Sequence, residues 1–162
     1  MNWLTKIPNA LFHGTDSLLN INDYETGRDT SNDYGLFGIV KTTRHGIFLT
    51  DNMDFAKEYG TRVIRIKSTL QNTANINDNL RYEFISSIDP WNERDLWIAA
   101  KYAQHIWQLF DGEVGSRFVN WLKGEGYDSA TFDEEIPVKE SDSFVSGNTT
   151  VVFDPSLLQE VD

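Results

Sequence analysis

The feature that most constrains this chain is the alternation of short apolar segments with polar stretches and helical patterns. The short segments have the length and the β-branched or aromatic content typical of strands, and they fall at residues 10–15, 46–50, 62–67, 126–132 and 149–153. Between them the sequence predicts helices at residues 51–60, 89–110 and 114–123. This order predicts one α+β domain over residues 1–162, with a mixed or mostly antiparallel sheet.

The helices have local start and stop signals. In the longest predicted helix, Asp89 can cap the N-terminus and Pro90 suits the first turn. Apolar residues then recur at helical spacing. Three polar stretches without periodicity, at residues 16–41, 68–79 and 133–147, are expected to be loops. Arg44 follows the first of these and is expected to be a solvated surface cation.

Composition and charge limit the kinds of site, cellular location and partner that this chain can have. The chain has no cysteine, which excludes disulfides and thiolate metal sites and fits a reducing cytoplasm. Residues 1–8 do not resemble a signal peptide, and no apolar run approaches a membrane span, so we expect a cytoplasmic protein. The net charge of −11 disfavours generic nucleic-acid binding. An acidic surface can bind a basic protein, or it can simply keep the chain soluble.

The segment most suggestive of a site is Phe12-His13-Gly14-Thr15, where an apolar run ends in polar residues. His13 can donate and accept hydrogen bonds, and Thr15 adds a hydroxyl. Gly14 has no side chain, so a ligand can approach its backbone closely. By itself the same segment also fits a core strand that runs into an ordinary turn.

Blocks that span most of the chain together resemble one family. Residues 12–15 are followed by Gly46-Ile47-Phe48-Leu49-Thr50, with Ala56 and Tyr59-Gly60 in the next predicted helix, and residues 126–128 lead to 151–155. This arrangement resembles the ADP-ribosyltransferase fold, on its poly(ADP-ribose)-polymerase and diphtheria-toxin side. It is similar in particular to the small ADP-ribosyltransferase domains of phage and mobile-element polyvalent proteins.

The resemblance implies a split sheet with an NAD cleft and flanking helices. It also implies a mono-ADP-ribosyltransferase that uses NAD as substrate and no metal, and that modifies a protein target more readily than a nucleic acid. A phage origin and a host target follow from the family's habitat. The implied ligand contacts come from residues in the first two blocks: His13 to the nicotinamide ribose, the backbone of Gly14 to the amide, Tyr59 and Phe48 to the ring, with Thr15 and Gly46 beside them.

Two positions depart from the family pattern, and the first is Phe48, where relatives often carry a tyrosine; phenylalanine can still stack but lacks the hydroxyl. The family has a catalytic glutamate ahead of the last apolar strand, and this chain has Thr149 there. A threonine can bond a ribose but supplies no negative charge for an oxocarbenium-like centre. Glu140 and Asp142 are the nearest acids in sequence that could replace it, and Glu134 and Glu135 come next.

Two other interpretations stay open on the sequence. The chain can be a catalytically degenerate NAD- or nucleotide-binding domain that acts as an inhibitor through its acidic surface. It can also be an α+β domain of unrelated function in which the motif matches arise by chance. The three histidines are far apart and show no ligand spacing, so a metal site is not expected.

Overall fold

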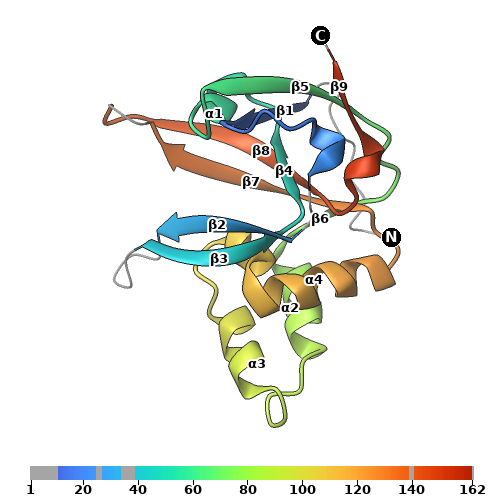
Figure 1. Cartoon of the computed structure of the whole chain (residues 1–162). Coiled ribbons are helices and arrows are strands. Elements are labelled where there is room, and N and C mark those ends of the chain that lie inside the picture. Colours follow the sequence, from blue (N-terminus) through green and yellow to red (C-terminus); the bar gives the residue numbers. More distant parts are fainter. Residues whose placement is uncertain (1–10, 25–26, 34–38, 139–140, 162) are drawn as a thin grey trace.

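The computed structural model describes residues 11–24, 27–33, 39–138 and 141–161, and shows a mixed sheet with most of its helices grouped on one side of it (Figure 1). The seven-stranded sheet has the order β6-β7-β8-β4-β1-β5-β9. Its strands are β1 (Leu11–Thr15), β4 (Ile47–Thr50), β5 (Arg62–Ser68), β6 (Thr73–Asn75), β7 (Ser129–Pro137), β8 (Phe144–Val152) and β9 (Leu158–Val161). Among the strands of the described residues, only β6 and β7 pair in parallel, so the predicted α+β class with a mixed sheet is confirmed.

The helices are short and lie mostly between β6 and β7 in the chain. They are α1 (Met53–Lys57), α2 (Asp78–Ser86), α3 (Arg94–Lys101) and α4 (Gly112–Gly124), with 3₁₀ turns η1 (Ile21–Asp23), η3 (Ile106–Phe110) and η4 (Pro155–Leu157). Within the described ranges, no helix is long and apolar enough to cross a membrane.

Two apolar cores lie on the two faces of the sheet. Successive residues of β8 separate them, because side chains alternate along a strand: Val151 packs into the core beneath α2 and α4, and Val152 into the core with β1 and β5. Phe84, Phe110 and Phe118 form the aromatic centre of the helix-side core, with the ring centroid of Phe118 4.6 Å from that of Phe84 and 5.3 Å from that of Phe110. This core anchors the helices to the strands that carry the site.

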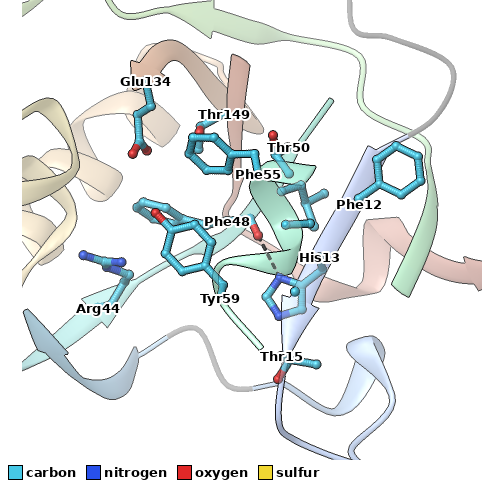
Figure 2. A pocket seen from close by; sticks show the side chains of 13 residues that line it. Phe12, His13, Thr15, Arg44, Phe48, Thr50, Phe55, Tyr59, Glu134 and Thr149 are labelled. Carbon is cyan, nitrogen blue, oxygen red and sulfur yellow. Dashed lines mark hydrogen bonds between the residues drawn. The ribbon is translucent and has the colours of Figure 1, made fainter. Parts of the chain in front are cut away.

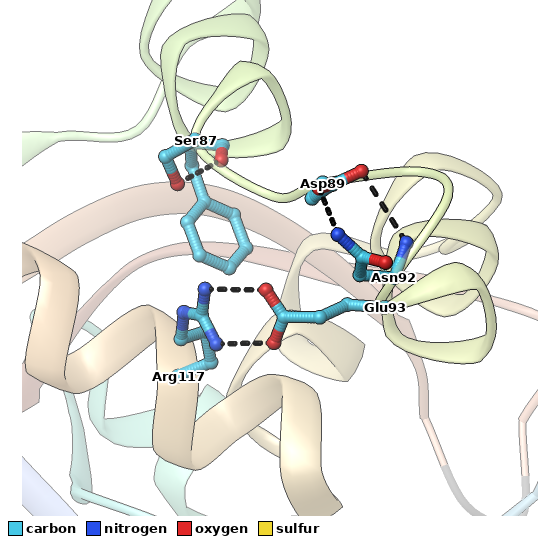
Figure 3. Close-up of polar contacts among 6 residues, drawn as sticks. Ser87, Asp89, Asn92, Glu93 and Arg117 are labelled. Carbon is cyan, nitrogen blue, oxygen red and sulfur yellow. Dashed lines mark hydrogen bonds and ion pairs between the residues drawn. The ribbon is translucent and has the colours of Figure 1, made fainter.

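The predicted helix over residues 89–110 is wrong as a single element. Asp89 accepts hydrogen bonds from the backbone of Trp91 and Asn92, so the chain makes a turn there, and α3 begins only at Arg94 (Figure 3). Arg117 of α4 binds the Glu93 carboxylate through two contacts, of 2.7 Å and 2.9 Å, and thereby holds the start of α3 against α4. Tertiary contacts thus divide a sequence pattern that is continuous by periodicity alone.

Helix α2 lies partly inside a predicted loop. Asn77 caps it by accepting a hydrogen bond of 2.9 Å from the backbone of Leu80. Leu80 and Phe84 are its buried residues, and so few apolar positions give little periodic signal. Strand β6 lies in the same predicted loop and is too short to be recognised by alternation.

Two further loop predictions are wrong because each of these segments contains strands that form a hairpin. In residues 16–41, strand β2 (Gly27–Asp33) pairs with β3 (Ile39–His45) in a separate two-stranded sheet. In residues 133–147, β7 and β8 continue as a long hairpin, with Asp133 opposite Asn148 and Pro137 opposite Phe144. Both hairpins are polar in sequence, so they lack the apolar alternation from which strands are predicted. The second correction places Glu134 on a strand, opposite Gly147 of β8.

Candidate functional site

A cavity of about 220 Å³ lies where β1, β4, α1 and the β7–β8 hairpin meet (Figure 2). Strands β1 and β4 share a single register pair, Phe12 with Thr50, whereas β1 and β5 pair along their length. The poorly paired boundary between β1 and β4 leaves room for side chains. The cavity is lined by Phe12, His13, Gly14, Thr15, Arg44, Phe48, Leu49, Thr50, Phe55, Ala56, Tyr59, Glu134 and Thr149.

His13 spans the boundary between the two strands. Its Nδ1 lies 2.8 Å from the carbonyl oxygen of Phe48, as the dashed line in Figure 2 shows. A carbonyl only accepts, so Nδ1 carries a proton and donates, and in the neutral ring Nε2 is then the acceptor. The ring is 7% exposed and packs edge-on against Tyr24, with centroids 5.3 Å apart. The imidazole is therefore held in one orientation at the cavity wall.

Gly14 lines the cavity and is also required by the packing of a helix. A Cβ on Gly14 would lie 1.8 Å from the carbonyl oxygen of Ala56 in α1. Gly60 has a matching role, because a Cβ there would lie 2.3 Å from the carbonyl carbon of Thr15. The two glycines let α1 and the residues after it pack directly on β1, and this packing brings Tyr59 over the cavity.

Aromatic rings form one wall of the cavity. Phe55 and Tyr59 lie with centroids 5.6 Å apart, and Phe48 packs its ring against Phe110 and Phe132 of the core. Tyr59 is 51% exposed as a residue, but in Figure 2 its hydroxyl end points inward, beside Phe48 and on the side of Arg44. Burial of that end raises the pKa of Tyr59, and the negative charge of Glu134 raises this pKa further. Tyr59 therefore stays protonated as a hydrogen-bonding phenol.

The expectation that Arg44 is a solvated cation is wrong. Its side chain is 13% exposed and makes a two-point ion pair with Asp111, with distances of 3.0 Å and 3.3 Å. The guanidinium carbon lies 4.5 Å from the ring centroid of Phe48 and 5.5 Å from that of Trp107. Nothing in the local sequence around Arg44 indicates this role, because Asp111 is 67 residues away along the chain.

The carboxylate of Glu134 lies in the same cavity as Thr149. In the hairpin, Phe132 lies opposite Thr149, and Glu134 is two residues further along β7, on the same face. Both Glu134 and Thr149 line the cavity. Burial raises the pKa of Glu134, and the Thr149 hydroxyl and the Arg44 charge act in the opposite direction.

The other predicted site residues are placed as follows. Thr15 lines the cavity and accepts hydrogen bonds from Tyr24 and Ser17. Gly46 is not among the lining residues; it makes the turn between β3 and β4 with a φ of 95°, and a Cβ on it would meet Val151 at 2.4 Å. Asp142 is exposed in the β7–β8 turn and does not line the cavity, and Glu140 lies outside the described residues.

An open groove continues from the cavity on the far side of Glu134. It lies between the β4–α1 turn and the β7–β8 hairpin, and we call it the acidic groove. Its lining residues are Asp51, Asn52, Met53, Asp133, Glu134, Glu135, Ser146, Gly147 and Asn148. Asn148 binds both Asp51 and Asp133, which fixes these carboxylates at the groove floor. Glu134 thus lies at the junction of an enclosed cavity and an acidic surface.

A metal centre is not evident in the part of the chain that the structure describes, where no three His, Asp or Glu side chains are arranged to hold an ion. The site therefore consists of one oriented imidazole, an aromatic wall, a fixed cation and a half-buried carboxylate. Such a set can bind a flat aromatic group and stabilise positive charge next to it.

The chain matches no known protein-family model, and no curated protein sequence is significantly similar to it. Among solved structures it is similar to a chain described as "Crystal structure of an anti-CRISPR protein". The two are 17% identical, with a TM-score of 0.41, and the alignment covers 94% of each chain. A similarity of this size establishes neither a shared fold nor a shared function.

Proposed function

We propose that the cavity binds the nicotinamide end of NAD and that the protein transfers ADP-ribose from NAD to a protein target. One observation carries the proposal: His13, Tyr59 and Glu134, from three separate segments, line the same cavity. These are the residue types that the family resemblance implies, with Glu134 in place of the glutamate missing at Thr149. The splayed boundary between β1 and β4 supports the implied split sheet.

The charge balance of the cavity favours a flat cation. Arg44 is neutralised by Asp111, which leaves Glu134 as the charge facing the aromatic wall of Phe48, Phe55 and Tyr59. The oxidised nicotinamide ring of NAD is flat and positively charged, and aromatic faces attract such cations. Ligand pockets are usually about 300–1,000 Å³, so this smaller cavity suits the ring and its ribose, with the rest of NAD on the surface.

The proposed reaction breaks the bond between the ribose C1′ and the nicotinamide nitrogen. The bonding electron pair goes to the ring, which leaves as neutral nicotinamide, while positive charge develops on the ribose. The carboxylate of Glu134 stabilises that charge, and the fixed imidazole of His13 orients the ribose. A nucleophile of the target then bonds to C1′ and loses its proton to solvent or to Glu134.

The acidic groove supports a protein target over a nucleic acid. It meets the cavity at Glu134, where the reacting ribose would lie, and it is lined by Asp51, Asp133 and Glu135. These carboxylates would repel a phosphate backbone and attract a segment with lysine or arginine. A phage origin and a host target remain predictions of the family resemblance alone.

The test is calorimetry with NAD and NADH beside an assay of nicotinamide release from NAD. We expect NAD to bind more tightly than NADH, whose reduced ring is neutral. Glu134→Gln should lower release by about 10²–10³-fold, the usual loss for one charge-stabilising group. Glu135→Gln is the matched control, since Glu135 is the exposed neighbour of Glu134 and lines the groove but not the cavity. Absence of both NAD binding and nicotinamide release in the wild type would reject the proposal.

A second candidate is NAD binding without turnover. Thr149 in place of the family glutamate favours it, because a threonine supplies no negative charge for a developing cation. Wild-type protein that binds NAD but releases no nicotinamide over a range of pH and with basic protein acceptors would support this candidate.

A further inference from the structure

Tyr24 is a buried tyrosine that contacts two residues of the cavity wall although it is not itself a lining residue. It follows η1 directly and is 4% exposed. Its ring packs edge-on against the imidazole of His13, with the two ring planes at 75° to each other. Its hydroxyl donates a hydrogen bond of 3.1 Å to Oγ1 of Thr15. His13 and Thr15 are two positions apart on β1 and share one face of the strand, so a single side chain reaches both.

The ring of Tyr24 limits the positions that the imidazole of His13 can occupy. Nδ1 of His13 is hydrogen-bonded to the carbonyl oxygen of Phe48 while the imidazole also packs against Tyr24. An imidazole that rotated about its side-chain bonds would lose one of these two contacts. The hydrogen bond at one ring nitrogen decides which nitrogen carries the proton. By holding the ring in place, Tyr24 therefore keeps the proton of neutral His13 on Nδ1.

The hydroxyl of Tyr24 determines what the hydroxyl of Thr15 can offer to a ligand. A threonine hydroxyl oxygen can accept two hydrogen bonds and donate one. Oγ1 of Thr15 accepts one from the Tyr24 hydroxyl and one, at 2.9 Å, from the backbone N–H of Ser17. Both accepting positions are then occupied, so Thr15 lines the cavity as a hydrogen-bond donor.

The C-terminal segment holds the turn that carries Tyr24. Glu160 of β9 accepts a hydrogen bond of 2.9 Å from the backbone N–H of Ile21, at the start of η1. The side chain of Asn22 donates to the carbonyl oxygen of Leu158. These two contacts join residues 139 and 136 positions apart along the chain. The position of Tyr24 is therefore set by the tertiary structure on the side opposite the cavity.

We propose that Tyr24 is a positioning residue for the β1 wall of the cavity. Its ring keeps His13 in the form protonated on Nδ1, and its hydroxyl makes Thr15 a donor. Tyr24 acts on a ligand only through these two side chains. The part of the inference that concerns NAD rests on the proposed function, whereas the state of the His13 ring does not.

The first measurement is the tautomer of His13 in the ligand-free protein, observed by NMR of the imidazole nitrogens. His13→Gln identifies the His13 signals among those of the three histidines. Wild type and Tyr24→Phe should show the form protonated on Nδ1, because phenylalanine keeps the ring. Tyr24→Leu removes the ring and should show a mixture of both tautomers.

Val152→Ala is the control for a merely structural role. Val152 is fully buried in the same core as Tyr24 and is not a lining residue of the cavity. This variant should melt at a lower temperature than wild type, since it leaves a cavity in the core, and should keep His13 protonated on Nδ1. Mixed tautomers in Val152→Ala, or an unchanged tautomer in Tyr24→Leu, would overturn the inference.

The second measurement is the dissociation constant of NAD by calorimetry. Tyr24→Phe should weaken NAD binding about 2- to 10-fold, the usual effect of one hydrogen bond, because Thr15 is no longer fixed as a donor. In a Thr15→Val background the same change should have no further effect, since the hydroxyl acts through Thr15. Equal losses in both backgrounds would overturn the role of the hydroxyl. This comparison decides the inference if Tyr24→Leu does not fold.

The two measurements separate this inference from the proposed function. If wild-type protein does not bind NAD, the proposed function fails, and the tautomers of Tyr24→Leu and Val152→Ala still decide whether Tyr24 positions His13. If NAD binds equally well to wild type, Tyr24→Phe and Tyr24→Leu, the proposed function stands and the positioning role of Tyr24 is overturned.

Discussion

Arg44 and Asp111 join β3 to the N-terminus of α4 through a two-point ion pair that is almost fully buried. The side chains are 13% and 4% exposed, and the backbones of the same two residues also form a β-bridge. The pair holds the guanidinium over Phe48, whose ring forms part of the cavity wall. One contact therefore connects the small hairpin, the helices and the candidate site.

Removing one partner of this pair should be strongly destabilising. Asp111→Asn leaves a buried guanidinium without its counter-charge, and breaking a buried ion pair usually costs about 3–5 kcal/mol of unfolding free energy. Urea denaturation of wild type and variant measures the loss.

Two variants test the physical reason. Glu93→Gln breaks the more exposed pair with Arg117 and should cost clearly less. The double variant Arg44→Met, Asp111→Leu leaves no unpaired charge and should recover much of the stability. If the double variant is as unstable as Asp111→Asn, the loss is due to packing and not to an unpaired charge.

Glu134 should make both stability and ligand binding depend on pH. Its pKa in the folded protein lies above the ordinary value of 4.5, so the folded state holds more protons than the unfolded state between pH 4.5 and the raised pKa. The contribution of Glu134 to stability therefore falls as pH rises through this window. Glu134→Gln should be more stable than wild type above it, and equal to wild type below pH 4.5.

The same titration should act in the opposite direction on NAD binding. The carboxylate attracts the nicotinamide cation, so wild-type affinity should fall as pH is lowered through the raised pKa of Glu134. Calorimetry across pH 4.5–8 measures the midpoint. Glu134→Gln should bind weakly at every pH, while Glu135→Gln should follow the wild-type curve. A wild-type midpoint that survives in Glu134→Gln would assign the titration to another group.

Gly14 should tolerate no side chain. In Gly14→Ala the new methyl overlaps the backbone of Ala56, so α1 must move away from β1. We expect a loss of at least about 1–3 kcal/mol in unfolding free energy, as for other overpacked sites, together with lost NAD binding. Thermal unfolding and calorimetry provide the readouts.

The control for this substitution is Gly124→Ala at the end of α4. A Cβ there meets no atom within 4 Å, and alanine is the better helix former. This variant should be unchanged or more stable by up to about 1 kcal/mol. Equal behaviour of the two alanine variants would mean that α1 does not need its close approach to β1.

Tyr59 should matter for binding far more than for stability. The residue is half-exposed, so Tyr59→Ala should change the unfolding free energy by less than about 1 kcal/mol. Loss of its ring opens the aromatic wall, and NAD affinity should fall by about 10-fold, within the range for aromatic contacts to cations. Tyr82→Ala removes an exposed tyrosine from α2, outside the cavity, and should leave NAD affinity unaltered.

Local sequence patterns predict part of the site well. Three segments that the sequence singles out line the cavity: the run that ends at His13-Gly14-Thr15, the strand with Phe48 and the residues around Tyr59. Each can be recognised in the sequence because it combines a short apolar segment with a glycine. The close packing of Gly14 on the backbone of Ala56 is a second demand on this glycine that the local sequence does not indicate. The bond from His13 to Phe48 joins residues 35 positions apart, which no local pattern indicates.

The position of Glu134, the proposed replacement for the family glutamate, illustrates the limit most clearly. Proximity in sequence to Thr149 favours Glu140 and Asp142, but strand pairing places Glu134 beside Thr149 instead. The register of the hairpin decides this, and a shift by one residue would point Glu134 to the other face. Polar strands such as these carry no apolar alternation from which the register can be read.

By itself, the sequence determined the class of the fold and the residue types available to the site. Apolar periodicity and glycine positions act over a few residues, so they specify strands, helices and turns such as β4 and α4. The tertiary structure alone decided that Arg44 meets Asp111 and that Glu134 stands beside Thr149 in one cavity. Those relationships depend on strand register and on packing between distant segments, and both are set by the free energy of the whole folded chain and not by any one segment.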